Sequence, residues 1–463
     1  MVEGLMNLPN VLRAPSLLQT LHWVADPVGY MEKSAQQYPD IFSAPILGGK
    51  HLVFINHPQA IQEILTSDRK RFIAPGRVNH ILSPLIGDAS VIMLEGDRHK
   101  RRRQLLMPPF HGERMRAYGN LICQLTERVV SQRAIAQPFN ARSMMQEISL
   151  QVILEAVFGV CEGERFEQLR ASITQMCELF RNPLGASFLF FPWMQQDLGT
   201  WMPWGRFLRA RSNIDKLLYA EIADRHQQDL RDRVDILSLL METRDEDGQP
   251  LSDSELRDEL MTLLFAGHET TATAMAWALY WIHHQPEVRE KLLQELDALG
   301  ANPDPMSIVR LPYLSAVCNE TLRLYPVAML TFTRIVTEPV ELLGYPLEPG
   351  MSVVGCIYLL HHREDLYPNS HEFRPERFLE RQFSPFEFMP FGGGARRCIG
   401  EALAVAEMKL VLATVLSRYQ LALADSRPEV PRRRGVTLGP SGRVKIQILG
   451  QRTTRPSEAI VSG

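Results

Sequence analysis

The chain has 463 residues, of which 45% are hydrophobic and 22% are charged, and its formal net charge is −3. This composition is that of a globular protein with a large buried core, and the lack of a basic excess excludes a dedicated nucleic-acid binder. The six cysteines are scattered without CxxC spacing, so we expect reduced thiols rather than a disulfide framework or structural zinc.

No segment has the features of a secretion signal or a membrane span. The N-terminal sequence lacks a basic segment followed by a continuous apolar one. No apolar run approaches the roughly 20 residues that a membrane helix needs. We therefore expect a cytoplasmic monomer without a transmembrane anchor, and peripheral membrane contact stays open.

Residues 1–90 mix strand-like and helix-like runs. HLVFINHP, residues 51–58, has the pattern of a strand that ends at a proline, and residues 59–67 have a helical pattern. We expect a β-rich N-terminal part over about 1–90 and a helical core over about 91–463. Together they are expected to form a single domain.

A basic run follows at residues 95–106, EGDRHKRRRQLL. His99 and Arg103 are four residues apart, so they share one helix face and suit one carboxylate. The other cations fall on different faces, where they form either a solvated surface or a docking patch for an acidic protein. These are Arg98, Lys100, Arg101 and Arg102.

Helical periodicity continues to about residue 299, with one interruption at residues 182–207. This insertion is rich in Phe, Trp, Met and Pro. It is either a loop packed on the core by its aromatic rings or a mobile lid over an apolar site.

The longest predicted helix begins at Ser252 and Glu255, which have capping-box spacing, and stops before Pro286. Some thirty residues at ~1.5 Å each span about 45 Å. Because the helix is apolar on most sides, it should cross the middle of the protein.

This helix contains AGHETT, residues 266–271. Ala266, Gly267 and Thr270 share one side, and the two small residues would leave a gap for a small ligand. Two alternatives stand beside a catalytic interpretation of the segment. The Thr270 hydroxyl could bond back to the Ala266 carbonyl, and Glu269 could simply pair with a base.

The C-terminal third combines helices and short strands. A helix carries CNETLRLYP and stops at Pro326, and Glu320 and Arg323 share one of its faces. Strand-like segments and loops follow, then a long helix over about 400–419. Residues 435–449, GVTLGPSGRVKIQIL, have the pattern of a hairpin.

FGGGARRCIG, residues 391–400, places one cysteine before that last helix. Backbone N–H groups and the positive helix end would favour the Cys398 thiolate. Three glycines would let the backbone approach a large flat group. The alternative is an ordinary buried cysteine beside a flexible turn.

The complete pattern F-x-x-G-x-R-x-C-x-G closely resembles the haem-binding signature of cytochrome P-450 monooxygenases of the soluble bacterial type. Similar motifs follow the family's order: H-x-x-x-R at 99–103, AGHETT, E-x-x-R at 320–323 and P-E-R-F at 375–378. The resemblance implies a mainly α (α+β) fold with a long central helix and small edge β-sheets.

The resemblance also assigns residues. It implies haem b (iron protoporphyrin IX) with Cys398 as the axial ligand of the iron, with Thr270 holding water or dioxygen and Glu269 relaying protons. It implies that Arg377 joins Glu320 and Arg323 in a buried ionic cluster. The remaining implied haem contacts are Ala266, Gly267, Phe391 and Gly400, with His99, Arg103, Arg334 and Arg396 near the propionates.

The implied activity is hydroxylation of a lipophilic substrate, of the fatty acid or terpenoid class, with dioxygen and two electrons from a ferredoxin or flavodoxin with its reductase. Apolar segments at 71–94, 182–207 and 326–332 favour such a substrate. The alternatives are a peroxide-using or isomerising haem-thiolate enzyme, against which the Glu269–Thr270 pair argues, and a non-catalytic haem-thiolate sensor.

Overall fold

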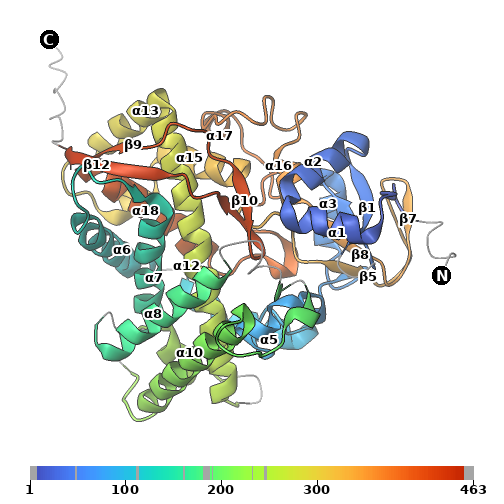
Figure 1. Ribbon diagram of the computed structural model, residues 1–463, viewed down its shortest axis with the longest axis horizontal. Helices are drawn as coiled ribbons and strands as arrows, with labels where there is room; N and C mark the ends of the chain where they lie inside the picture. The colour runs from blue at the N-terminus through green and yellow to red at the C-terminus, as the bar shows by residue number, and fades with distance from the viewer. Residues whose placement is uncertain are drawn as a thin grey trace.

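Figure 1 shows the computed structural model of the chain. It describes residues 8–46, 50–110, 114–159, 162–180, 188–189, 191–231, 233–244 and 248–452. Helices dominate and small sheets lie at the edges, which confirms the predicted mainly α fold. Within the described part, no helix combines the length and apolarity needed to cross a membrane.

Helix α12, Asp253–His284, runs through the middle of the molecule (Figure 1). Its N-terminus has the predicted capping box, in which Ser252 and Glu255 bond each other's backbone N–H groups. Trp277 is fully buried in its second half. Apolar residues on most faces therefore place this helix in the core, as the sequence predicted.

The other helices pack around α12 or lie at the ends of the molecule. Their bounds are α1 Ser16–Ala25, α2 Pro27–Gln37, α3 Pro58–Thr66, α4 Ser83–Ile86, α5 Gly96–Leu106, α6 Arg114–Ser131, α7 Ala141–Phe158, α8 Glu164–Leu179, α10 Pro203–Arg225, α11 Ile236–Glu242, α13 Pro286–Asp297, α14 Pro305–Val309, α15 Pro312–Leu324, α16 Ile357–His361, α17 Arg377–Glu380 and α18 Glu401–Arg418.

The largest sheet has the strand order β1-β2-β8-β5-β3. Its strands are β1 Ile41–Ile46, β2 Lys50–Ile55, β3 Phe72–Ile73, β5 Arg334–Val336 and β8 Ser352–Gly355. Strand β2 and helix α3 confirm the strand and the helix predicted at 51–58 and 59–67, whereas α1 and α2 make residues 1–90 more helical than expected. Residues far beyond 90 complete the sheet, because strand pairing is non-local and leaves little trace in local patterns.

The predicted hairpin over 435–449 is wrong. Strand β11, Thr437–Pro440, pairs with β10, Pro431–Arg434, and Gly435 adopts a φ of 57° in the turn between them. Strand β12, Lys445–Gln451, pairs instead with β9, Tyr419–Leu423, and with β4, Phe139–Asn140. The chain reverses at Gly435, where glycine tolerates the left-handed conformation, so β11 and β12 enter different sheets. A further small hairpin is β6, Val340–Leu342, with β7, Tyr345–Leu347.

The aromatic insertion divides between surface and core. Residues 182–187 and 190 lie outside the described residues, and residues 203–207 already belong to α10. Trp193 and Trp201 are 71% and 74% exposed, whereas Trp204 is buried against Phe207 at 4.8 Å between ring centroids. Neither sequence interpretation describes the whole insertion.

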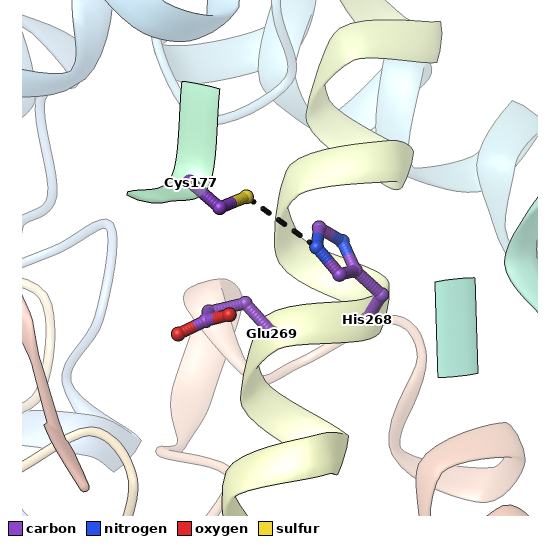
Figure 2. A group of neighbouring side chains, drawn as sticks. All are labelled: Cys177, His268 and Glu269. Atoms are coloured by element: carbon purple, nitrogen blue, oxygen red, sulfur yellow. Dashed lines mark hydrogen bonds between the residues drawn. The ribbon is translucent and has the colours of Figure 1, made fainter. Parts of the chain in front are cut away.

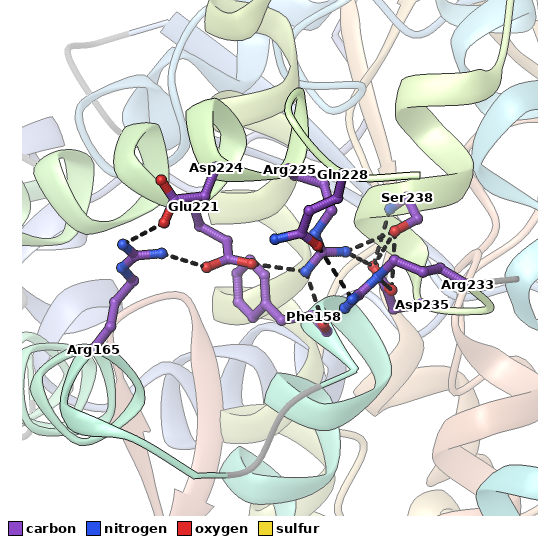
Figure 3. Close-up of polar contacts among 9 residues, drawn as sticks. All are labelled: Phe158, Arg165, Glu221, Asp224, Arg225, Gln228, Arg233, Asp235 and Ser238. Carbon is purple, nitrogen blue, oxygen red and sulfur yellow. Dashed lines mark hydrogen bonds and ion pairs between the residues drawn. The ribbon is translucent and has the colours of Figure 1, made fainter. Parts of the chain in front are cut away.

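Charged side chains join the start of α8 to the ends of α10 and α7 (Figure 3). Arg225 is buried and donates to Glu221, to Asp235 and to the Phe158 carbonyl at the end of α7. Arg165 of α8 donates to Glu221 as well. Because both terminal nitrogens of Arg225 donate to oxygen acceptors, this network can hold the charged helix ends together inside the protein.

Glu407 is a buried carboxyl group on α18. Burial raises its pKa from 4.5 to about 8, and the neighbouring Ser149 hydroxyl of α7 opposes the shift only in part. A carboxylate here would lack a cationic partner to offset its lost hydration, so the protonated form is favoured in the folded state.

We predict that replacing Glu407 with Gln changes the pH dependence of stability. Because the folded pKa is raised, the wild-type chain keeps its full stability below pH 4.5 and loses it as the pH rises toward 8. Each pH unit in this window corresponds to about 1.4 kcal/mol. Relative to wild type, the free energy of unfolding of E407Q should therefore rise by about 2 to 3 kcal/mol between pH 6 and pH 8.

Urea denaturation at the two pH values measures this difference. Glu290 is exposed on α13 and provides the matched control. E290Q should shift the free energy of unfolding by no more than about 0.5 kcal/mol at either pH. An equal effect of E407Q at both pH values would contradict a protonated carboxyl group at this position.

Candidate functional site

The cysteine turn lies between a short 3-10 helix, Gly394–Arg396, and the start of α18. The Cys398 N–H donates to the Phe391 carbonyl oxygen at 3.0 Å, which closes the turn. The Gly400 N–H lies at the Cys398 sulfur and lowers the thiol pKa. The turn thus holds the sulfur beside a backbone donor at the N-terminus of α18.

Cys398 combines an accessible side chain with a desolvated environment. The residue is exposed, yet burial raises the pKa of its thiol, against the effects of Gly400, Arg103 and Arg397. Both observations hold if the sulfur faces a space inside the fold. The Gly400 N–H acts in the predicted direction, and desolvation opposes it with the larger effect on the thiol pKa.

The glycines of the turn serve two purposes. A Cβ on Gly394, whose φ is 65°, would lie 2.4 Å from an Asp68 carboxylate oxygen, so a side chain is excluded there by backbone conformation and by contact. A Cβ on Gly392 or Gly400 would meet nothing within 4 Å. The turn is therefore packed on one side and open on the other.

Arg396 is buried, and no carboxylate of the described residues accepts a hydrogen bond from it. Its guanidinium donates to the backbone carbonyls of Ala74, Val91, Ile92 and Leu94. Burial, followed by the charge of Arg334, lowers its pKa to about 10, while the carboxylates of Asp68 and Glu95 act in the opposite direction. The local interior therefore carries more positive than negative charge.

The three other predicted cations gather around Arg396. Arg334 is buried and forms a bidentate pair with Asp68. His99 is buried on α5, and its pKa falls to about 3 through burial and then through the charges of Arg396 and Arg103. Arg103 donates to the Arg397 carbonyl oxygen at 2.6 Å. Asp68 balances only one of these charges.

Helix α12 presents Ala266 and Thr270 to an accessible space. Ala266 is exposed in the middle of the helix and Thr270 is partly exposed, whereas their neighbours Leu264 and Ala272 are buried. The Thr270 hydroxyl donates to the Ala266 carbonyl at 2.6 Å, which is one of the two arrangements that the sequence left open.

The structure requires a glycine at 267 for helix packing, not for the predicted ligand gap. A Cβ at this position would lie 2.9 Å from Ile153 of α7. The glycine thus allows the two helices to approach closely. The predicted gap beside α12 does not lie at Gly267, because Ile153 fills that space.

Glu269 is partly exposed and paired with a base. Its carboxylate accepts from Arg142 and from the Gln146 side-chain amide, both on α7. This is the ion pair that the sequence left open as an alternative to a proton relay. The partners could not be read from the sequence, because they lie more than 120 residues away.

Glu320 and Arg323 of α15 are fully buried and form a bidentate pair with distances of 2.7 and 2.9 Å. Arg377 donates to the same carboxylate at 2.9 Å, and so does the Arg374 backbone N–H. The carboxylate therefore joins α15 to the segment around α17, which precedes the cysteine turn in the sequence.

Arg102 was predicted to lie on the surface, and this was wrong. It is buried and donates to Glu255 at 2.6 Å and to Glu259 at 2.7 Å, both on α12. Desolvation raises the Glu259 pKa to about 7 despite the Arg102 charge. The local sequence shows on which face of α5 Arg102 lies. It does not show that this face is directed at α12. Arg98 and Lys100 are exposed.

The residues of the site fit haem in charge and in ligand chemistry. Cys398 supplies a soft sulfur donor to an internal space. Ala266, in the middle of α12, supplies a small exposed surface. The surplus positive charge around Arg396 suits two carboxylates that would otherwise be buried without partners.

Comparison with known proteins gives a consistent result. The family model described as cytochrome P450 matches residues 9–446. The putative cytochrome P450 135B1 of Mycobacterium tuberculosis is 34% identical over 460 residues, which cover 99% of this chain and 95% of the relative. The putative cytochrome P450 135A1 of the same organism is 34% identical over 448 residues, 96% of each chain.

Solved structures share the fold. The retinoic acid-bound cyanobacterial CYP120A1 superposes with a TM-score of 0.85 at 25% identity, over 96% of this chain and 99% of that one. The haem domain of cytochrome P450DA gives a TM-score of 0.82 at 23% identity, over 97% and 98% of the two chains.

Proposed function

The chain belongs to the cytochrome P450 family and is a haem-dependent monooxygenase, and from this premise we propose a role for each residue of the site. Cys398 would be the protein ligand of the haem iron. The observation that carries this assignment is its accessible sulfur in a desolvated interior beside the Gly400 N–H. Bound haem supplies the activation of dioxygen.

Three guanidinium groups and one neutral imidazole hold the haem carboxylates in this proposal: Arg103, Arg334, Arg396 and His99. Their support is the surplus of positive charge, since Asp68 is the one carboxylate in contact with them among the hydrogen bonds described above. Phe391 and Gly400 flank the sulfur. Ala266 of α12 offers a small surface for the other face of the haem. The Glu320 cluster holds the segment around α17 and does not touch the reacting atoms.

Thr270 and Glu269 deliver protons to the reacting oxygen. The Thr270 hydroxyl donates to the Ala266 carbonyl, and its oxygen keeps lone pairs that can accept a hydrogen bond from water. Glu269 reaches the side chains of Arg142 and Gln146. For a relay, its carboxylate would release Arg142 and turn toward Thr270, and its partial exposure leaves room for this movement.

The substrate is lipophilic, and we favour the terpenoid and fatty acid classes. Phe265 precedes the exposed Ala266, and Phe180 of the α8 end stacks edgewise on Phe265 and on Phe207. Leu82 and Ile92 of the segment before α5 are only partly buried against the same core. The related structure that contains retinoic acid, an apolar carboxylic acid, supports this choice.

An acidic ferredoxin or flavodoxin, itself reduced by a reductase, supplies the two electrons. The exposed Arg98 and Lys100 of α5 provide a basic surface. The same helix carries Arg103, which reaches the Arg397 carbonyl beside the cysteine. Complementary charge at this face would steer an acidic carrier toward Cys398.

We predict that the reduced protein with carbon monoxide shows the red-shifted Soret band of thiolate ligation. C398S should lose this band, because an alcohol oxygen does not replace the thiolate donor. C123S is the control, since Cys123 is a half-buried thiol on α6, and it should keep the band. A red-shifted band in haem-loaded C398S would remove Cys398 as the ligand.

We predict that T270A uncouples electron use from product formation. Without the hydroxyl, proton delivery fails and more of the consumed reductant should appear as hydrogen peroxide, with product per reductant falling on the order of tenfold or more. The assay uses dioxygen, a ferredoxin and its reductase.

Thr271 provides the matched control for this prediction. Its hydroxyl donates to the Gly267 carbonyl at 3.0 Å, and the side chain is buried. T271A should therefore keep its coupling. Equal coupling in T270A and wild type, or full activity of wild type with peroxide alone, would contradict the proposed relay.

We predict that long-chain fatty acids and retinoids shift the Soret band of the oxidised protein at micromolar concentration. The apolar side chains around Ala266 should favour their burial by about 25 cal/mol per Å² of apolar surface. Titration followed by difference spectroscopy measures the effect. Polar sugars and nucleosides are the controls, and a preference for them would contradict the lipophilic class.

A further inference from the structure

Three side chains that can bind metal ions meet where α8 lies against α12 (Figure 2). The Cys177 Sγ of α8 points to the His268 Nε2 of α12 at a distance of 3.4 Å. The ligand atoms of Cys177, His268 and Glu269 all lie within 4.8 Å of one another. This cluster is separate from the cysteine turn, and none of the roles proposed above uses Cys177 or His268.

The His268 ring is oriented as a metal ligand would be. Its Nδ1 lies 2.6 Å from the Leu264 carbonyl oxygen, which can only accept, so Nδ1 carries the hydrogen. The neutral ring therefore directs the unprotonated Nε2 at Cys177. Metal-ligating histidines almost always donate their other N–H in this way, which fixes the tautomer. Burial lowers the His268 pKa to about 4 and keeps the ring neutral.

The distances suit a tetrahedral cation. Zinc lies about 2.3 Å from thiolate sulfur and about 2.0 to 2.1 Å from imidazole nitrogen. A tetrahedral angle then separates sulfur and nitrogen by about 3.5 Å, close to the 3.4 Å between Sγ and Nε2. Without a cation, the same distance allows the thiol to donate a hydrogen bond to Nε2.

Glu269 can supply the third ligand atom. Its two carboxylate oxygens accept from Arg142 and Gln146, and each oxygen has a further lone pair. Hydrogen bonds of this kind orient ligating carboxylates. The positive charge of Arg142 opposes a cation, whereas the thiolate and the Glu269 carboxylate favour it.

We propose that Cys177, His268 and Glu269 bind a divalent cation of the zinc type, with a water molecule as the fourth ligand. Binding breaks the S–H bond of Cys177, releases that proton to solvent and forms the sulfur–metal bond, with no change of oxidation state. The cation joins α8 to α12. Cys177 and Glu269 are partly exposed, which gives the ion access to the site.

The position of the site links it to turnover. Glu269 is the acid of the proposed relay, so a bound cation would occupy one of its oxygens and slow proton delivery. This consequence rests on the proposed function, whereas the binding site does not. Binding and turnover are therefore measured separately.

The test uses the haem-loaded protein after treatment with a chelator, and zinc chloride as the probe. Competition against a zinc-binding dye should give one site per chain at micromolar or lower free zinc, and C177A and H268A should each weaken it at least tenfold. H283A is the matched control, since His283 lies on the same helix and its Nδ1 contacts the Leu279 carbonyl in the same way.

A second measurement needs no variant and remains valid if H268A fails to fold. Zinc should slow the alkylation of Cys177 but not that of Cys123, followed by mass spectrometry of the peptides. Equal zinc affinity in C177A and wild type, together with unprotected alkylation, would overturn the site. Zinc that binds at Cys177 without slowing turnover would support the site and contradict the relay role of Glu269.

Discussion

The burial of guanidinium groups is the constraint on which the reaction site depends. Arg396 lies inside the protein with four backbone carbonyls and without a carboxylate of its own. Such a charge is costly unless it finds an anion or strong acceptors. The carbonyls belong to the segment before α5, so the cost is reduced only when that segment lies against the cysteine turn. In the proposed assignment, two haem carboxylates would offset the positive charge that remains.

Buried charge also connects the cysteine turn to the largest sheet. Asp68 accepts from Arg334 of β5 and from the Ala395 N–H, and a side chain on Gly394 would collide with it. One carboxylate thus joins strand β5 to the cysteine turn. On α15, the Glu320 carboxylate accepts from both Arg323 and Arg377 and so joins this helix to α17. Buried ion pairs thus hold the segments on either side of the turn, and the hydrogen bonds of Phe391 and Gly400 hold Cys398 within it.

Local signals in the sequence predicted the central helix correctly. The predictions that failed concern contacts between distant segments. The capping box at Ser252 and the proline after α12 are local, and the predicted helix is confirmed. The partner of Arg102 lies 157 residues away, and the partner of β11 depends on a turn at Gly435. The reason for Gly267 is a side chain of α7. A motif names the residues that matter, but their partners come from packing that no single segment encodes.

One turn of α12 serves several neighbours because successive residues of a helix point about 100° apart. Ala266 and Thr270 lie on one side and reach the internal space, Gly267 lets α7 approach, His268 meets α8, and Glu269 reaches Arg142. A shift of α8 that moves Cys177 must therefore move His268 or break their contact. Because His268 and Glu269 are adjacent on this helix, the contact of Cys177 with His268 lies one residue away from the acid that pairs with Arg142.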